Sequence, residues 1–169
     1  VKGGLLYHTY SMMRSARALL KIYDFMDDDL VYAGVALHDL CKLREIMSDE
    51  NGISDSYTLE GRLLGHITMM VCDIQSEAEK LGIDPEVTLL LKHMVLSHHF
   101  YPEFGSPVMP MFPEAELLHY VDVLDSRMDQ FRKTMSATPE KEFSEKVWIL
   151  DKRSVYNHGL QNQKEQDNN

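Results

Sequence analysis

The chain has 169 residues and a formal net charge of −10, from 17 Lys and Arg against 27 Asp and Glu. This length suffices for one domain that buries its core without disulfide bonds, so Cys41 and Cys72 are expected to be core thiols in a reducing, cytoplasmic protein. Its apolar stretches are far shorter than the ~20 residues of a membrane span, which excludes a membrane-spanning protein. The negative charge argues against unaided binding of nucleic acid.

Apolar residues at three- and four-residue steps predict an amphipathic helix over residues 4–25. The acidic run Asp27–Asp29 is typical of a helix start, and a second apolar stripe predicts a helix from there to about Glu45. This second helix carries the adjacent pair His38 and Asp39.

The polar segment 48–56 contains Asn51-Gly52, which favours a turn. Thr58 then opens a third predicted helix that ends near Leu81 and carries His66. No internal repeat or strand-like alternation is visible in the sequence, which favours an all-α fold.

A fourth helix is predicted to begin at Asp84 and Pro85, a cap followed by a first-turn proline, and to end at His98-His99. The next segment, residues 100–113, contains four prolines and one glycine. It is therefore expected to be an extended loop placed to cover a site next to the two histidines.

A fifth helix is predicted from Glu114 to about Met135, with Asp122 beside its apolar stripe. Residues 139–150 are a candidate sixth helix. The last residues, 159–169, are almost all polar and are expected to be disordered. The fold class is therefore predicted to be all-α.

Histidines and aspartates on all five of these helices have the chemistry of metal ligands. Neighbouring helical positions point about 100° apart, so an adjacent His-Asp pair can reach one cation only if other helices complete the shell. Imidazole and carboxylate ligands together suit Mn, Fe, Co, Ni or Zn. Two such ions that share one carboxylate can activate a water molecule for attack on the phosphorus atom of a phosphodiester. The set comprises His8, His38, Asp39, His66, His98, His99 and Asp122.

Any one of these histidines, taken alone, is more often a satisfied core or surface residue than a ligand. Their joint occurrence favours metal binding, because each buried imidazole would otherwise need its own hydrogen-bond partner. His93, His119 and His158 are given structural roles, and His119, three residues before Asp122, is a candidate to support a ligand.

The spaced His, His-Asp, Asp pattern resembles the HD-domain metal-dependent phosphohydrolase superfamily. More specific strings are similar to YhaM-type 3′-5′ exoribonucleases of Gram-positive bacteria, over nearly the whole chain except the tail. The resemblance implies an all-α HD-domain bundle of five to six helices around a dinuclear metal site, over residues 1–152. A polar tail that is expected to be disordered follows over 153–169. The strings include residues 3–9, 57–67, 96–99, 105–108 and 118–125.

The resemblance also implies two divalent transition metal ions, with manganese favoured and cobalt, iron or nickel as options. One ion would be held by His8, His38, Asp39 and Asp122. The other would be held by Asp39, His66, His98 and His99, so that Asp39 bridges the two ions and is part of the catalytic machinery.

Lys42 resembles the lysine that often follows the HD pair, and it is expected to be a catalytic residue that contacts the scissile phosphate or the bridging hydroxide. An exposed helix lysine is the alternative interpretation. The family usually has Gly before this lysine, whereas this chain has Cys41. Gly105 and Ser106 are weaker candidates for substrate binding through the covering loop, where turn formation explains them equally well.

The favoured function is a metal-dependent 3′-5′ exoribonuclease that releases nucleoside monophosphates from single-stranded RNA, with single-stranded DNA as a further possible substrate. In the resembling family an upstream OB-fold domain is thought to bind the nucleic acid. The chain starts at Val1 without Met, and we expect it to be a fragment that lacks this domain. A homo-oligomer is compatible with the sequence.

Two alternatives remain open. The His98-His99 pair also resembles HD-type nucleotide phosphohydrolases and cyclic-dinucleotide phosphodiesterases, although the residues that follow, Phe100-Tyr101-Pro102, only partly match the Gly-Tyr-Pro string of the latter. The third hypothesis is a binding or regulatory module in which the metals are structural. A closed metal site without hydrolysis of any phosphodiester would favour it.

Overall fold

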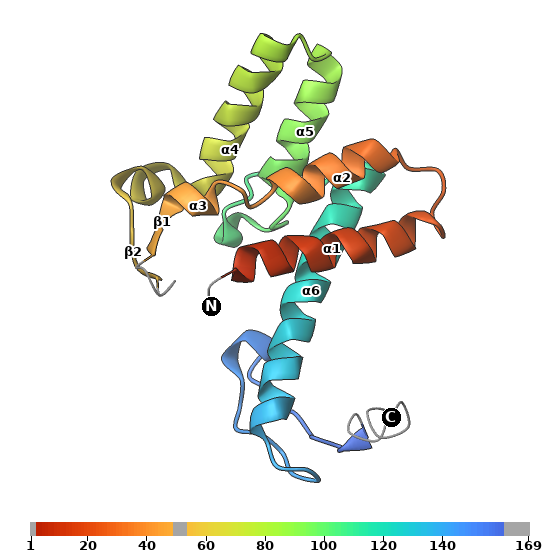
Figure 1. The fold of residues 1–169 in the computed structure, drawn as a ribbon, viewed down its shortest axis with the longest axis vertical. Coiled ribbons are helices and arrows are strands. Elements are labelled where there is room, and N and C mark those ends of the chain that lie inside the picture. Colours follow the sequence, from red (N-terminus) through yellow and green to blue (C-terminus); the bar gives the residue numbers. More distant parts are fainter. Residues whose placement is uncertain (1–2, 49–53, 161–169) are drawn as a thin grey trace. The chain divides into compact units, whose positions relative to one another are not determined.

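The computed structural model describes residues 3–48 and 54–160, and it is mostly helical, which confirms the predicted all-α class. The chain divides into an N-terminal unit that ends at Asp122 and a C-terminal unit that begins at Val123. No helix in the described ranges is both long and apolar enough to cross a membrane. In chain order the elements are α1 (Gly4–Leu20), α2 (Asp28–Leu37), α3 (Lys42–Glu45), β1 (Ile46–Ser48), β2 (Ser54–Tyr57), α4 (Leu59–Leu81), α5 (Pro85–Ser97), the 3₁₀ turn η1 (Pro102–Phe104), α6 (Pro113–Ala137) and the 3₁₀ turn η2 (Trp148–Leu150) (Figure 1).

The main core of the N-terminal unit is built by one face each of α1, α2 and α5 and by the first turns of α6. Met12 of α1, Val35 of α2, Met94 of α5 and Leu118 of α6 are fully buried in it. A Cβ at Gly34 would lie 2.4 Å from the Met94 Cε atom, so glycine lets α2 approach α5 closely. This packing holds α1, α2 and α6 around the end of α5.

A second apolar cluster lies between α4 and α5, which run side by side as a helical hairpin (Figure 1). Ile67 and Met70 of α4 pack there with Val95 of α5 and with Cys41. The prediction of core thiols is therefore confirmed for Cys41 and wrong for Cys72, which α4 exposes to solvent. Since α5 contributes to both clusters, its last turn lies between them.

Two predicted helices are shorter than expected. The first ends at Leu20 and not at Phe25. The second ends at Leu37 and is followed by a turn, in which the Leu40 N–H donates to the Leu37 carbonyl and the Lys42 N–H to the Asp39 carbonyl. The apolar stripe misled the prediction because Leu40 is 46% exposed and buries little surface. The His-Asp pair thus lies in a turn between α2 and α3.

Besides its helices, the described part of the chain contains two short strands that the sequence did not indicate. β1 and β2 pair antiparallel, with Ile46 opposite Tyr57 and Met47 opposite Ser56. Their residues are few and largely exposed, so the sequence lacks the alternation that would have indicated them. The Asn51-Gly52 turn lies outside the described residues.

In the C-terminal unit, residues 139–150 do not form the predicted sixth helix. Lys141 has φ +65°, a left-handed conformation, and the segment makes antiparallel bridges, Phe143 with Tyr156 and Val147 with Arg153. Pairing with residues 153–157 replaces the helical hydrogen bonds that Pro139 and the left-handed residue would interrupt.

The first residues of the expected tail, 153–160, pack within the C-terminal unit. Val155 and Asn157 are buried, and the Asn157 side-chain amide donates to the Met135 carbonyl (3.1 Å) and to the Thr138 carbonyl (2.7 Å). These bonds satisfy carbonyls at the end of α6. The expectation of disorder beyond residue 160 falls outside the described residues.

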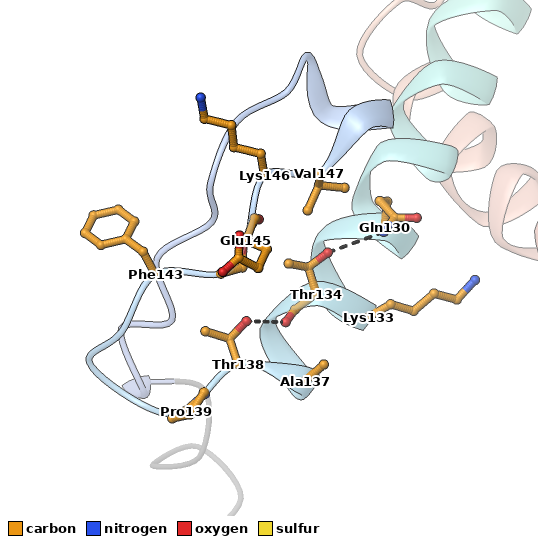
Figure 2. Close-up of a pocket in the computed structure, with 11 residues that line it drawn as sticks. Gln130, Lys133, Thr134, Ala137, Thr138, Pro139, Phe143, Glu145, Lys146 and Val147 are labelled. Carbon is orange, nitrogen blue, oxygen red and sulfur yellow. Dashed lines mark hydrogen bonds between the residues drawn. The ribbon is translucent and has the colours of Figure 1, made fainter.

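A pocket of about 510 Å³ lies within the C-terminal unit, between the end of α6 and the segment around Phe143 (Figure 2). Lys133 and Lys146 line it together with Thr134 and Thr138, and its lining contains one carboxylate, that of Glu145, and no histidine. It therefore lacks the ligand set that the sequence analysis singled out.

Candidate metal centre

The fold brings the predicted ligands together from separate elements of the N-terminal unit. One group of potential ligand atoms belongs to Asp39, His66, His98 and His99, and a second to His8, His38 and Asp39, with the atoms of each group within 4.8 Å of one another. Asp39 belongs to both groups, as the sequence analysis expected for a bridging carboxylate. His8 comes from α1, the His38-Asp39 pair from the turn after α2, His66 from α4, and His98 and His99 from the end of α5.

Two of the histidines are oriented by the last turn of their own helix. His38 Nδ1 donates to the Val35 carbonyl (2.9 Å), and His98 Nδ1 donates to the Val95 carbonyl (2.6 Å). A carbonyl can only accept, so the proton of each neutral ring is on Nδ1 and the Nε2 lone pair is free. These Nε2 atoms lie 3.4 Å and 3.8 Å from carboxylate oxygens of Asp39.

His66 is oriented by a carboxylate. Its ring Nδ1 donates to Glu45 Oε2 (2.9 Å) and its backbone N–H donates to Glu45 Oε1 (3.1 Å). The ring Nε2 then faces Asp39 Oδ1 at 3.3 Å. This orientation depends on Gly65, whose φ of +71° and ψ of 157° interrupt α4 one residue before His66. That region of backbone space is essentially open to glycine alone.

Four buried polar atoms at this centre have no hydrogen-bond partner in the described part of the chain. Leaving such an atom unsatisfied costs about 1–3 kcal/mol, and native proteins rarely tolerate it without a reason. Three are imidazole nitrogens around the Asp39 carboxylate and the fourth is an oxygen of that carboxylate; all offer lone pairs, so bound cations would satisfy them. The donor set therefore fits a divalent transition metal. The atoms are His38 Nε2, Asp39 Oδ1, His66 Nε2 and His98 Nε2.

The protonation states also suit metal binding. Burial opposes ionisation of Asp39, but hydrogen bonding and charge from His38 and the charge of Lys42 hold its pKa well below the usual range. Burial, reinforced by the charges of His99 and His38, lowers the pKa of His98 to about 3. Burial and then the charge of Lys42 lower the pKa of His66. Near neutral pH Asp39 is therefore ionised, and His66 and His98 are neutral.

Asp122 of α6 contacts His8, whose Nε2 lies 3.1 Å from Asp122 Oδ1. Burial raises the pKa of Asp122, but the interaction with His8 outweighs it and lowers the pKa below its ordinary value. The His8 ring lies 5.6 Å from the His38 ring, measured between centroids. The structure therefore brings Asp122 to the same group of side chains, where it is engaged with His8.

Lys42, the first residue of α3, lies beside the shared carboxylate. Its Nζ donates to Asp39 Oδ2 at 2.7 Å, and its side chain is 31% exposed. The sequence predicts Lys42 on the same continuous helix as Asp39, whereas the structure places Asp39 in the turn after α2 and Lys42 at the start of α3. The positively charged Lys42 ammonium group thus lies at the solvent-facing edge of the centre.

The segment after α5 fixes His99. His99 Nδ1 donates to the Phe104 carbonyl (2.5 Å), and the His99 backbone N–H donates to Ser106 Oγ (3.0 Å). Ser106 is fully buried, and Gly105, with φ +97°, makes the turn before it. These contacts give both residues a role in placing His99, and contact with a substrate stays a prediction for both.

The sequence analysis missed Glu45, which it treated only as a helix end. No motif in the sequence marks Glu45 as a partner of His66. The two residues are brought into contact by the fold, since β1 and β2 lie between α3 and α4 in the chain. His119 was a candidate supporting residue, and its Nδ1 donates to the His98 carbonyl at 2.7 Å. His93, given a structural role, accepts a hydrogen bond from the Met111 N–H at 3.1 Å through Nε2.

Comparison with known proteins gives a family and two close relatives. Residues 5–127 match the HD domain family. The chain is 46% identical over 153 residues to proteins named 3′-5′ exoribonuclease YhaM from Bacillus licheniformis and from Bacillus subtilis (strain 168). The match covers 90% of this chain and 48% of each relative, so the chain spans about half the length of the curated relatives it matches. No solved structure matches it significantly.

Proposed function

The chain belongs to the HD domain family, and from this we propose that it carries the catalytic centre of a metal-dependent 3′-5′ exoribonuclease. The observation that carries the proposal is the convergence of four unsatisfied buried atoms around Asp39. The direction of attack and the RNA substrate are proposed because the two relatives are named 3′-5′ exoribonucleases.

We propose that the centre holds two divalent ions, manganese in the first place, with cobalt, iron or nickel as substitutes. Mixed nitrogen and oxygen ligands suit these metals better than Ca²⁺, which prefers an all-oxygen shell. When bound, such ions lower the pKa of water and neutralise charge on a phosphate under attack. One ion is assigned to His8, His38, Asp39 and Asp122, and the other to Asp39, His66, His98 and His99.

The side chains of the centre have further roles besides holding the ions. Asp39 stays ionised at neutral pH and is shared between the two positions. Lys42 presents a partly exposed ammonium group next to this carboxylate, where it binds an oxygen of the scissile phosphate. His119 holds the His98 backbone, and Ser106 holds the His99 backbone, which keeps the end of α5 in place.

Binding of a long RNA is proposed to depend on an additional OB-fold domain. A net charge of −10 opposes a polyanion, and the relatives are about twice as long as this chain. A cytoplasmic location is proposed with this function.

The test is digestion of a 5′-labelled single-stranded RNA in Mn²⁺, comparing the chain with an Asp39→Ala variant. A ladder that shortens progressively from the 3′ end, and that the variant abolishes, is the expected result. Glu77→Ala is the matched control, because Glu77 is an exposed acid whose partner is Lys80. Turnover of a cyclic dinucleotide without any ladder would contradict the exonuclease and favour a small-nucleotide phosphodiesterase.

A further inference from the structure

The two metal positions are built differently, and this rests on the proposed dinuclear function. We call Asp39, His66, His98 and His99 the His66 position, and His8, His38, Asp39 and Asp122 the His8 position. We propose that the His66 position takes the first ion and binds it more tightly, and that Glu45 is the positioning residue responsible.

The His66 position is prepared for an ion before one arrives. Three of the four unsatisfied buried atoms belong to it, namely His66 Nε2, His98 Nε2 and Asp39 Oδ1. Each already points at the others, with Asp39 Oδ1 lying 3.3 Å from His66 Nε2 and 3.8 Å from His98 Nε2. An ion that binds there breaks no existing hydrogen bond of these atoms and does not have to order a mobile side chain. Little of the metal–ligand interaction energy is therefore spent on rearranging the protein.

The His8 position holds one unsatisfied buried atom, His38 Nε2, and its other ligand atoms already have partners within the protein. His8 Nε2 and Asp122 Oδ1 contact each other at 3.1 Å, so an ion has to replace that contact. The Asp39 oxygen that faces His38, Oδ2, accepts a hydrogen bond from Lys42 Nζ at 2.7 Å. An ion at the His8 position therefore meets a neighbouring positive charge and competes for that oxygen.

The two positions also differ in the groups that accept hydrogen bonds from their histidine rings. His66 is backed by a carboxylate, whereas His38, His98 and His99 donate from Nδ1 to backbone carbonyls. A carboxylate partner raises the basicity of the opposite ring nitrogen and fixes the ring more firmly than a carbonyl does. The stronger imidazole donor thus lies at the His66 position.

The fold holds Glu45 for this contact. Its backbone carbonyl accepts from the Thr58 N–H at 2.9 Å, where β2 ends and α4 begins. A Cβ at Gly61 would lie 2.4 Å from the same carbonyl oxygen, so only glycine lets α4 pack this closely. Both side-chain oxygens are then used by His66, one on its ring and one on its backbone N–H.

The test is a Mn²⁺ titration of the full chain by calorimetry, with the number of bound ions counted by equilibrium dialysis and no RNA present. Two phases are expected. His8→Ala removes only the weaker phase, and His66→Ala removes the tighter one. Glu45→Gln weakens the tighter phase about 10–100-fold, the usual effect of losing a carboxylate behind a ligand histidine, while Glu77→Gln leaves both phases unchanged.

The order is overturned if His8→Ala removes the tighter phase, and the role of Glu45 is overturned if Glu45→Gln binds both ions like the parent chain. Thermal unfolding in chelator establishes that each variant is folded. Should Glu45→Gln fail to fold, Glu45→Asp replaces it, because it keeps the charge but draws the carboxylate back from His66. Because no RNA is used, a chain that binds ions in this order yet turns over a cyclic dinucleotide and no RNA would refute the exonuclease and leave the present proposal standing.

Discussion

The ion pair between Lys42 and Asp39 links a buried carboxylate of the metal centre with a partly exposed ammonium group. The lysine stabilises the carboxylate, yet it also stands where a phosphate would approach. The two roles are separable by experiment, because only the second depends on the substrate.

Replacing Lys42 by Met is expected to lower kcat by about 10²–10³, the usual loss when a donor to developing charge is removed. Metal binding should persist, since Lys42 is not a ligand and its removal relieves competition for Asp39 Oδ2. Single-turnover cleavage of a short labelled RNA measures the effect. Lys80→Met, at an exposed lysine paired with Glu77, is the control. Unchanged kcat in Lys42→Met would assign the lysine a structural role only.

The buried His98 makes the metal-free protein sensitive to acid. Its pKa falls from an ordinary value of 6.5 to about 3, so between these values the unfolded state binds a proton that the folded state does not. Stability is therefore expected to fall as the pH drops below 6.5 toward 3, by up to about 1.4 kcal/mol per pH unit from this residue. Urea unfolding in chelator at pH 7 and pH 5 measures the slope.

The His98→Gln variant should have a shallower slope, because the titrating group is gone. His158→Gln, at an exposed position of the C-terminal unit, should keep the slope of the parent chain. If all three proteins lose the same stability between pH 7 and pH 5, His98 does not account for the acid sensitivity.

At the scale of elements, the α3–hairpin–α4 segment does the positioning. Glu45 ends α3, the two strands lead the chain back, and Thr58 caps α4 by accepting from the Gly61 N–H at 2.9 Å. The break at Gly65 then turns His66 toward Asp39. A small sheet with little core of its own thus serves to connect a supporting carboxylate with its histidine.

The Gly65→Ala variant is expected to lose about 1–3 kcal/mol of stability, since its backbone lies in a region that L-residues rarely adopt. A Cβ there would meet only Glu45 Oε1, at 3.8 Å, so the backbone and not crowding is the cause. It should also weaken Mn²⁺ binding, because relaxation of the backbone moves His66. Denaturant unfolding and calorimetry measure the two effects.

Gly82→Ala is the matched comparison, because Gly82 is also left-handed, with φ +67°, but caps the far end of α4. It should lose about 1–2 kcal/mol without a change in Mn²⁺ binding. If both variants bind Mn²⁺ like the parent chain, the break in α4 is not what orients His66.

At the scale of the whole molecule, charge limits what the catalytic centre can do alone. The chain carries −10 at neutral pH, and two bound divalent ions would offset only part of this. The centre is thus suited to the chemistry of a phosphodiester and poorly suited to holding a long polyanion.

Fusing a single-stranded RNA-binding domain to the N terminus is therefore expected to lower KM for a 20-nucleotide RNA at least tenfold, through effective concentration. For a dinucleotide, which cannot occupy both domains, kcat/KM should not change. Steady-state kinetics at 50 and 200 mM salt measure this, with a steeper salt dependence expected for the fusion. An equal gain for both substrates would show that the added domain acts on the centre and not on RNA capture.

The sequence determined the fold class, the family resemblance and the residue types of the centre. His38 and Asp39 were identifiable because adjacent ligand residues on an apolar segment are a costly way to fill a core, and His66, His98 and Asp122 because each lies on its own periodic helix. These are local properties, so the sequence displays them. The structure brings these residues into contact, while the ligand roles and the boundary at residue 152 stay predictions.

Only the tertiary structure decided which atoms face which. Local pattern did not show that the helix ends at Leu37, since the apolar stripe continues to Leu40. Nor could it show that two short strands follow Glu45 or that residues 141–147 pair with 153–157, because each depends on hydrogen bonds with residues further along the chain. The role of Glu45 and the different surroundings of the two Asp39 oxygens arise the same way. The sequence shows which side chains can act as ligands, because this is a property of single residues. The fold decides how each side chain is oriented and whether its ligand atom already has a partner.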